Sequence, residues 1–160
     1  MIIDIDVGNS SIKWCLRAGA ETIYHRSQTD AELVQSIVAA FSDYALSPTN
    51  RMKIRVASVR SEQQTNELTK TLFDQLHVMP VVVHSQQESA GVKNSYREPE
   101  KMGVDRWCAV LAAVAEADAL SFNANICVVD AGTATTIDFV DATRNPVSYT
   151  HLRAHETSID

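Results

Sequence analysis

An apolar run that ends in Asp-x-Gly occurs twice in this chain, once near the N-terminus and once far along the sequence. The first copy is Ile2–Ile5 followed by Asp6–Gly8, and the second is Ile126–Val129 followed by Asp130–Gly132. Glycine adopts backbone conformations that residues with a Cβ avoid, and it lets a ligand approach the main chain closely. One Asp-x-Gly turn is uninformative, because many hairpins contain one. Two copies, each behind an apolar strand, indicate a duplicated strand-turn-strand unit.

Small polar residues follow both glycines. They are Asn9, Ser10 and Ser11 in the first copy and Thr133, Thr135 and Thr136 in the second. Turn amides and hydroxyls donate hydrogen bonds to phosphate oxygens, and carboxylates hold Mg²⁺ directly or through its waters. We therefore expect Asp6 and Asp130 to face a nucleotide and its cation across a cleft, with Lys13 on a phosphate. The alternatives are ordinary turn capping for the carboxylates and an exposed strand position for Lys13.

The composition excludes several classes of protein. The chain has 160 residues, of which 45% are hydrophobic, so it can bury a core of ordinary size. Its net charge of -6 and the lack of a basic cluster argue against a nucleic-acid partner. The three cysteines are far apart and predict neither a metal site nor a disulfide framework. No apolar run reaches membrane-spanning length and no basic segment precedes the N-terminal run, so we expect a cytoplasmic protein without a signal peptide or a membrane partner.

Hydrophobic periodicity predicts alternating strands and helices. Strands are expected at 1–7, 11–16, 21–26, 54–59, 80–84, 126–130 and 135–140. Helices are expected after Asp30, read as an N-cap, after a capping box of Ser61 and Gln64, and after Gly103. This order predicts an α/β fold with a mixed sheet, followed by the opening hairpin of a second domain of the same plan. After Val140 the strand alternation is lost.

A third motif, Met102–Trp107, lies at the start of the last predicted helix. An aspartate such as Asp105 in a first helical turn interacts with the helix dipole, a contribution of about 0.3–1 kcal/mol that requires no catalytic role. The functional interpretation makes Asp105 a general base for a substrate hydroxyl and Arg106 a clamp for a carboxylate or phosphate. The helix N-terminus and Arg106 both favour the ionised Asp105, and phosphoryl transfer tolerates so weak a base. Tyr96, just upstream, either lines a substrate pocket or is a surface tyrosine.

Together the three motifs resemble those of the type III pantothenate kinases. The matching residues are Asp6-x-Gly8-Asn9-Ser10, Gly103-x-Asp105-Arg106-Trp107 and Asp130-x-Gly132-Thr133-Ala134, in the family's order. The resemblance extends from Met1 to about Val140 and implies the acetate and sugar kinase, heat-shock ATPase and actin superfamily. It implies an actin-like ATPase (ribonuclease H-like) domain at 1–122 and the start of a second, incomplete one at 123–143. Because the strand alternation is lost after Val140, we expect a non-native tail at 144–160.

The resemblance also implies a function and a set of site residues. The reaction is the ATP-dependent phosphorylation of pantothenate to 4'-phosphopantothenate, the first step of coenzyme A biosynthesis, by a homodimer that uses Mg-ATP and a monovalent cation, potassium or ammonium. Asp105 corresponds to the family's proton acceptor and Asp130 to its cation ligand. The implied ATP contacts are Asp6, Val7, Gly8, Asn9, Ser10, Ser11, Ile12, Lys13 and Thr133. The implied pantothenate contacts are Tyr96, Gly103, Val104, Asp105 and Arg106.

Two features depart from the family pattern. Ser10 replaces the commoner threonine and keeps the hydroxyl. The family continues with a complete second domain that supplies adenine contacts and much of the dimer interface, so we expect the 160-residue chain to be a truncated fragment with little or no activity. Two other functions stay open: a kinase for another small hydroxyl substrate such as a sugar, and a nucleotide-binding regulator of the Bvg accessory factor type.

Overall fold

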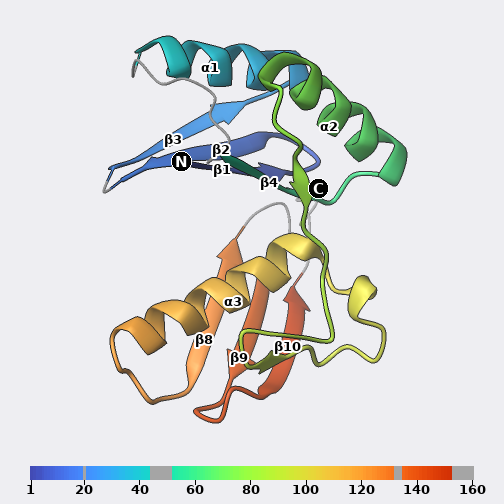
Figure 1. The fold of residues 1–160 in the computed structure, drawn as a ribbon. Coiled ribbons are helices and arrows are strands. Elements are labelled where there is room, and N and C mark those ends of the chain that lie inside the picture. Colours follow the sequence, from blue (N-terminus) through green and yellow to red (C-terminus); the bar gives the residue numbers. More distant parts are fainter. Residues whose placement is uncertain (20, 44–51, 132–134, 153–160) are drawn as a thin grey trace, which may run out of the picture. The chain divides into compact units, whose positions relative to one another are not determined.

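The computed structural model describes residues 1–19, 21–43, 52–131 and 135–152 (Figure 1). The chain divides into two compact units, the first unit Met1–His84 and the second unit Ser85–Asp160. The domain division expected at residue 122 stays a prediction. No helix among the described residues is long and apolar enough to cross a membrane.

A mixed five-stranded sheet is the framework of the first unit (Figure 1). Its order is β3-β2-β1-β4-β5, with bounds β1 Ile2–Val7, β2 Ile12–Ala18, β3 Glu21–Ser27, β4 Lys53–Ser58 and β5 Val81–Val82. β1 pairs antiparallel with β2 and parallel with β4. The predicted strands and the mixed sheet are confirmed, although the strand expected at 80–84 keeps only two residues in β5.

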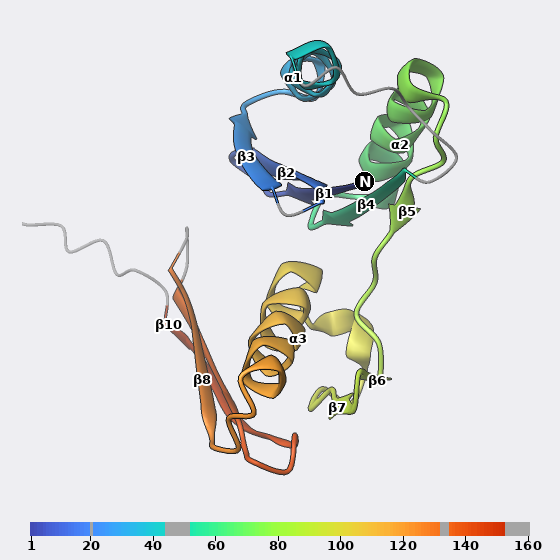
Figure 2. The same cartoon turned by 60° about the vertical axis from the view of Figure 1, so that its left-hand side comes forward.

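Alternation along β1 decides which face of this sheet is buried. Ile3, Ile5 and Val7 lie on the buried face, whereas Asp4 and Asp6 lie on the opposite one. Helices α1 (Asp30–Asp43) and α2 (Glu62–Leu76) cover the apolar face (Figure 2). The helices contribute buried residues at helical spacing, namely Leu33, Ile37, Leu68, Leu72 and Leu76.

Both helices of the first unit begin with a side-chain cap. Ser61 Oγ accepts a hydrogen bond from the Gln64 amide, and the Gln64 side chain accepts one from the Ser61 amide, which confirms the predicted capping box. The predicted N-cap of α1 is wrong by one residue, because Thr29 Oγ1 accepts the hydrogen bond from the Glu32 amide at 3.2 Å. Asp30 is instead the first residue of α1, where its carboxylate binds another part of the unit.

The second unit combines one long helix with a three-stranded antiparallel sheet. The sheet order is β10-β9-β8, with bounds β8 Ile126–Ala131, β9 Thr135–Val140 and β10 Pro146–Leu152. Helix α3 (Val104–Ala119) packs against the sheet through Trp107, Val110 and Val114. The segment before α3 contains the short strands β6 (Glu88–Ser89) and β7 (Val92–Lys93) and the 3-10 turn η1 (Pro99–Lys101). The predicted helix and second hairpin are thereby confirmed.

The sequence suggested that the strand pattern ends at Val140. The structure instead continues with β10, which pairs antiparallel with β9. A tight turn reverses the chain, and in it the Asp141 carboxylate accepts hydrogen bonds from the amides of Thr143 and Asn145 at 2.8 and 2.9 Å. Such Asx turns lack the Asn-Gly or Asp-Gly pair by which short hairpins are recognised, so the reversal left no strong signal. The non-native origin expected for 144–160 stays a prediction.

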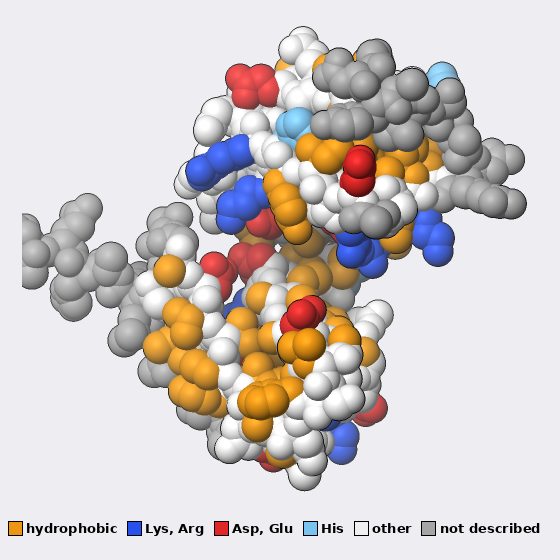
Figure 3. Space-filling view, turned by 90° about the vertical axis from the view of Figure 1, so that its left-hand side faces the viewer, with side chains coloured by type: hydrophobic (Ala, Val, Ile, Leu, Met, Phe, Trp, Pro, Cys, Tyr) orange, Lys and Arg blue, Asp and Glu red, His pale blue; other side chains and the backbone are white. Residues whose placement is uncertain are grey.

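One face of the second-unit sheet is not covered by α3. The β8–β9 register places Cys127 opposite Phe139 and Val129 opposite Ile137 on this face. Val129 and Phe139 are 60% and 42% exposed. Hydrophobic side chains accordingly gather on the surface of the second unit (Figure 3). The described residues of β8 and β9 therefore make this uncovered face largely apolar.

Candidate functional site

The first predicted site lies at the end of β1 and in the turn to β2. The antiparallel register places Lys13 opposite Asp6, and Lys13 Nζ lies 3.9 Å from Asp6 Oδ2. The two side chains are 66% and 44% exposed. An ion pair as exposed as this contributes about 0–1 kcal/mol, so the ammonium can turn toward an incoming anion at little cost. The structure thus brings two predicted ATP contacts together at one edge of the sheet.

Gly8 closes the turn between β1 and β2. Its amide donates a hydrogen bond to the Ser11 carbonyl at 3.1 Å, and a Cβ at this position would lie 3.0 Å from the same oxygen. A side chain at position 8 would therefore be tight against the Ser11 carbonyl, and glycine leaves room for this close approach of two backbone segments. Asn9 and Ser10 are exposed at the tip, and Ser11 Oγ accepts a hydrogen bond from Arg26 at 3.0 Å. The turn presents polar groups to solvent, as a phosphate-binding turn must.

Two of the implied ATP contacts are core residues. Val7 and Ile12 are fully buried among the side chains of the first unit. Strand alternation explains this, because these positions share the buried face of the sheet whereas Asp6 and Lys13 share the opposite one. Their side chains therefore hold the turn on the sheet and are not placed to meet a ligand.

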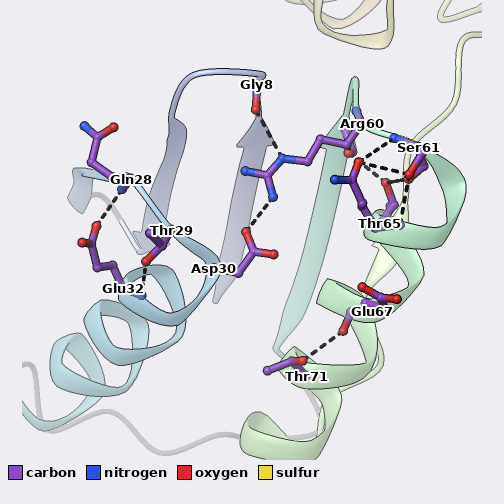
Figure 4. Close-up of polar contacts among 12 residues, drawn as sticks. Gly8, Gln28, Thr29, Asp30, Glu32, Arg60, Ser61, Thr65, Glu67 and Thr71 are labelled. Carbon is purple, nitrogen blue, oxygen red and sulfur yellow. Dashed lines mark hydrogen bonds and ion pairs between the residues drawn. The ribbon is translucent and has the colours of Figure 1, made fainter.

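Arg60 belongs to this site although no sequence motif singled it out. It follows β4, which is parallel to β1 and pairs Ser58 with Val7, so both strands end at the same edge of the sheet. Arg60 Nε donates to the Gly8 carbonyl at 3.4 Å, and Nη1 donates to Asp30 Oδ1 at 2.7 Å (Figure 4). A signal was available, because functional groups in α/β sheets gather at the carboxyl ends of neighbouring parallel strands.

The third motif lies at the start of α3. Asp105 is exposed in the first turn, and its Oδ1 accepts a hydrogen bond from the Arg106 amide at 2.7 Å. The side chain folds back over Gly103, where a Cβ would lie 2.7 Å from the same oxygen. Any larger residue at 103 would therefore displace the Asp105 carboxylate. Val104, between them, is buried.

Arg106 is buried, and its guanidinium forms a bidentate ion pair with Asp138 of β9. The Nε–Oδ2 and Nη2–Oδ1 distances are both 2.7 Å, and the side chains are 5% and 6% exposed. Nη1 donates to the Tyr96 hydroxyl at 3.2 Å. Burial works to lower the pKa of Arg106, but the hydrogen bonds and charge of Asp138 outweigh it and raise that pKa above its ordinary value. The guanidinium is thus held charged by Asp138, and its expected role as a ligand clamp stays a prediction.

Asp138 is the second site residue that the sequence patterns missed. It lies in the apolar context of β9, at the register position opposite Val128, and its side chain is buried. A carboxylate is almost never fully buried unless a cation pairs with it. The lone acidic residue within Thr135–Val140 was therefore a signal, since a carboxylate on the core side of a strand requires a partner.

Asp130 is the last residue of the strand predicted at 126–130, before the second Asp-x-Gly turn. It is exposed, and the β8–β9 register places it opposite Thr136. Gly132 and Thr133 lie outside the described residues. Within the described ranges, no three His, Cys, Asp or Glu side chains are grouped to hold a metal ion. Asp6 belongs to the first unit and Asp130 to the second, so the cleft expected between them stays a prediction.

Solved structures of other proteins share the fold of this chain. A putative 2-dehydro-3-deoxygalactonokinase from Sinorhizobium meliloti matches with a TM-score of 0.53 and 11% sequence identity, over 94% of this chain and 54% of that one. A Ppx/GppA phosphatase from Aquifex aeolicus matches with a TM-score of 0.51 and 14% identity, over 94% and 51%. Identities this low show the fold alone. The chain has the actin-like ATPase fold that the sequence predicted.

The family follows from the sequence comparisons. The family model for type III pantothenate kinase matches residues 2–147. Type III pantothenate kinases of Pseudomonas fluorescens (strain Pf0-1) and Pseudomonas savastanoi pv. phaseolicola (strain 1448A / Race 6) are 35% and 37% identical to it over 145 and 149 residues. Each match covers 89% of this chain and 54% of the relative, so the chain spans about half the length of the curated relatives it matches. The chain belongs to the type III pantothenate kinase family.

Proposed function

We propose that this chain carries the phosphate-binding turn and the pantothenate-binding segment of a type III pantothenate kinase. The reaction is transfer of the γ-phosphate of ATP to the hydroxyl of pantothenate, which yields 4'-phosphopantothenate for coenzyme A synthesis. The observation that carries this proposal is the family match, because the matched range contains all three motifs in order. The chain spans about half of its relatives, so the activity is proposed for a protein of their length.

The turn between β1 and β2 is the proposed site for the phosphates of Mg-ATP. The exposed residues Asn9 and Ser10 supply hydrogen-bond donors, and Lys13 adds a positive charge beside Asp6. The Asp6 carboxylate suits Mg²⁺ bound through its waters. Thr133, which lies outside the described residues, is the proposed contact from the second hairpin.

Asp105 is the proposed general base. Its exposure at the start of α3 leaves it open to the approach of a substrate hydroxyl. The hydrogen bond from the Arg106 amide fixes one carboxylate oxygen and so orients the other to accept the hydroxyl proton. Phosphoryl transfer depends chiefly on positioning and charge stabilisation, so a carboxylate suffices as the base.

Pantothenate is proposed to lie along Gly103–Arg106, with Tyr96 as a further contact. Gly103 is exposed and leaves room for the Asp105 carboxylate, and Tyr96 is held by its hydrogen bond from Arg106. Because Asp138 binds Arg106 through two hydrogen bonds, this wall of the site is preorganised. A rigid wall suits a reaction that depends on the placement of one hydroxyl.

Asp130 is the proposed ligand of a monovalent cation, potassium or ammonium. It is an exposed carboxylate at a strand end, and an oxygen ligand of this kind fits a hard cation whose shell backbone carbonyls and water complete. When bound, the ion supplies positive charge near the phosphates. A protein of the relatives' length is proposed to act as a cytoplasmic homodimer.

Replacing Asp105 by asparagine tests the proposed base. Residues 1–143 are joined to the remaining part of the Pseudomonas fluorescens relative, and pantothenate-dependent ADP formation is measured. We expect Asp105→Asn to lower turnover about 100- to 10,000-fold while Mg-ATP affinity stays unchanged. Glu116→Gln, at the other end of α3, is the control and should leave both unchanged.

Unchanged turnover in Asp105→Asn would contradict the assignment of the base. Turnover with a sugar but not with pantothenate would point to the kinase for another small hydroxyl substrate. Mg-ATP binding without turnover on either substrate would point to the nucleotide-binding regulator.

A further inference from the structure

The guanidinium of Arg60 connects separate segments at the base of the β1–β2 turn (Figure 4). Nε donates to the Gly8 carbonyl at 3.4 Å, and Nη1 donates to Asp30 Oδ1 at 2.7 Å. Asp30 opens α1, and Arg60 itself leads from β4 toward α2. The Arg60 side chain is only 19% exposed, against 42% for Asp30. One cation therefore ties the turn to the helical layer of the first unit.

The backbone that carries this guanidinium is itself held by hydrogen bonds. The Arg60 amide donates to Ser58 Oγ at 3.2 Å, and the Thr65 hydroxyl donates to the same oxygen at 2.9 Å. The Val59 amide continues the ladder between β4 and β1 by donating to the Val7 carbonyl at 3.1 Å. The backbone next to Arg60 is therefore hydrogen-bonded to both β1 and α2, which places its side chain at the turn.

The direction of the Gly8 carbonyl decides where the next amide points. In a planar trans peptide the C=O and N–H groups point in opposite directions, so a carbonyl turned to Arg60 turns the Asn9 amide away from it. Asn9 is exposed at the tip of the turn. Backbone amides that point outward from a turn are the donors that bind phosphate. A Gly8 carbonyl turned outward would instead place a partial negative charge on this surface and repel an anion.

We propose that Arg60 is a positioning residue for the phosphate-binding turn: it holds the Gly8 carbonyl inward and thereby presents the Asn9 amide to the phosphates of a nucleotide. Asp30 anchors the guanidinium for this task. The inference rests on the proposed function, because it takes the anion at this turn to be a nucleotide phosphate. We expect that lysine does not replace Arg60, because its ammonium donates from one atom and cannot match the two separate donor atoms, Nε and Nη1, of the planar guanidinium.

Amide hydrogen exchange tests the positioning without any ligand. In the 160-residue chain, we expect Arg60→Met to speed exchange of the Gly8 amide about fivefold, because the turn loses one hydrogen bond. Arg60→Lys should lose the same protection, and Asp30→Asn should lose part of it. Arg26→Met is the matched control, since Arg26 binds the Ser11 side chain of the same turn and no backbone carbonyl there. Unchanged Gly8 exchange in Arg60→Met, in a protein whose core amides exchange as in the wild type, would overturn the proposal.

Calorimetric titration with Mg-ATP connects the positioning to phosphate binding. We expect Arg60→Met and Arg60→Lys to weaken binding about tenfold, and Arg26→Met to change it less than about twofold. Wild-type affinity in Arg60→Lys, or faster Gly8 exchange with unchanged affinity in Arg60→Met, would overturn the role in phosphate binding. If the wild-type chain binds no Mg-ATP, the proposed function fails for this chain, and the exchange result still decides whether Arg60 positions the turn.

Discussion

At the scale of single residues, two arginines organise the candidate site, each through an aspartate that lies outside the three motifs. Arg60 is partly exposed and binds Asp30, whereas Arg106 and Asp138 are both almost completely buried. The energetic consequences differ, because an exposed ion pair contributes little and a buried pair has already lost its hydration. Removing one member of the buried pair leaves a charge in the core without compensation.

The Arg106–Asp138 pair should therefore show strong coupling in a double-mutant cycle. We expect Asp138→Leu alone to lower the free energy of unfolding of the second unit by about 3–5 kcal/mol, because the buried guanidinium loses its partner. Arg106→Met combined with Asp138→Leu should recover most of that loss, since it leaves no buried charge. Urea unfolding followed by NMR signals of the second unit measures both. With Arg106→Met alone measured to complete the cycle, a loss in the double variant equal to the sum of the two single losses would show that the pair is not coupled.

At the scale of elements, the chain reverses direction by two different kinds of turn. In the β1–β2 turn, the Gly8 amide donates to the Ser11 carbonyl, and a Cβ at position 8 would crowd the same oxygen. The β9–β10 turn depends on a side chain, because the Asp141 carboxylate accepts hydrogen bonds from Thr143 and Asn145. The tip of the first turn, Asn9 and Ser10, is exposed to solvent. In the second turn, the Asp141 carboxylate is already hydrogen-bonded within the turn.

The β9–β10 hairpin should consequently be sensitive to acid. The hydroxyl of Thr143 and then the amide of Asn145 lower the pKa of Asp141 below its ordinary value. The stabilisation is complete above the ordinary aspartate pKa of about 3.9 and is lost as the pH falls through the lowered pKa of the folded form. We expect the β10 amides to lose exchange protection over that acidic range, and Asp141→Asn to remove the pH dependence. If Asp130→Asn, the control on β8, removes it instead, the turn is not the cause.

At the scale of the whole molecule, local sequence patterns predicted the helices and strands. Strand pairing and helix packing decided which side chains contact one another. Alternation and helical spacing are properties of short segments, so the β1–β2 and β8–β9 hairpins and the helices α1, α2 and α3 could be predicted from the sequence. The α1 cap was misplaced because Thr29 and Asp30 are adjacent capping residues, and only the backbone geometry chooses between them. Arg60 and Asp138 were missed because their partners are distant in sequence and become neighbours only through strand pairing and helix packing.

The motif residues illustrate the same limit. The sequence predicted which residues belong to the proposed phosphate-binding turn, and the structure adds that Val7 and Ile12 face the core while Asp6 and Lys13 face outward. It predicted Arg106 as a clamp for a ligand, which stays a prediction, but it did not predict that the guanidinium binds Asp138. Burial and pairing of this kind depend on the partner strand and helix, which a motif does not contain.

NMR mapping of ligand contacts on the 160-residue chain tests the central claim most directly. Mg-ATP and pantothenate are added separately at millimolar concentration, and the backbone amide signals are followed. The account predicts that Mg-ATP shifts the signals of Gly8–Ser11 and that pantothenate shifts those of Gly103–Arg106. Shifts confined to other segments, or no shift from either ligand, would contradict it.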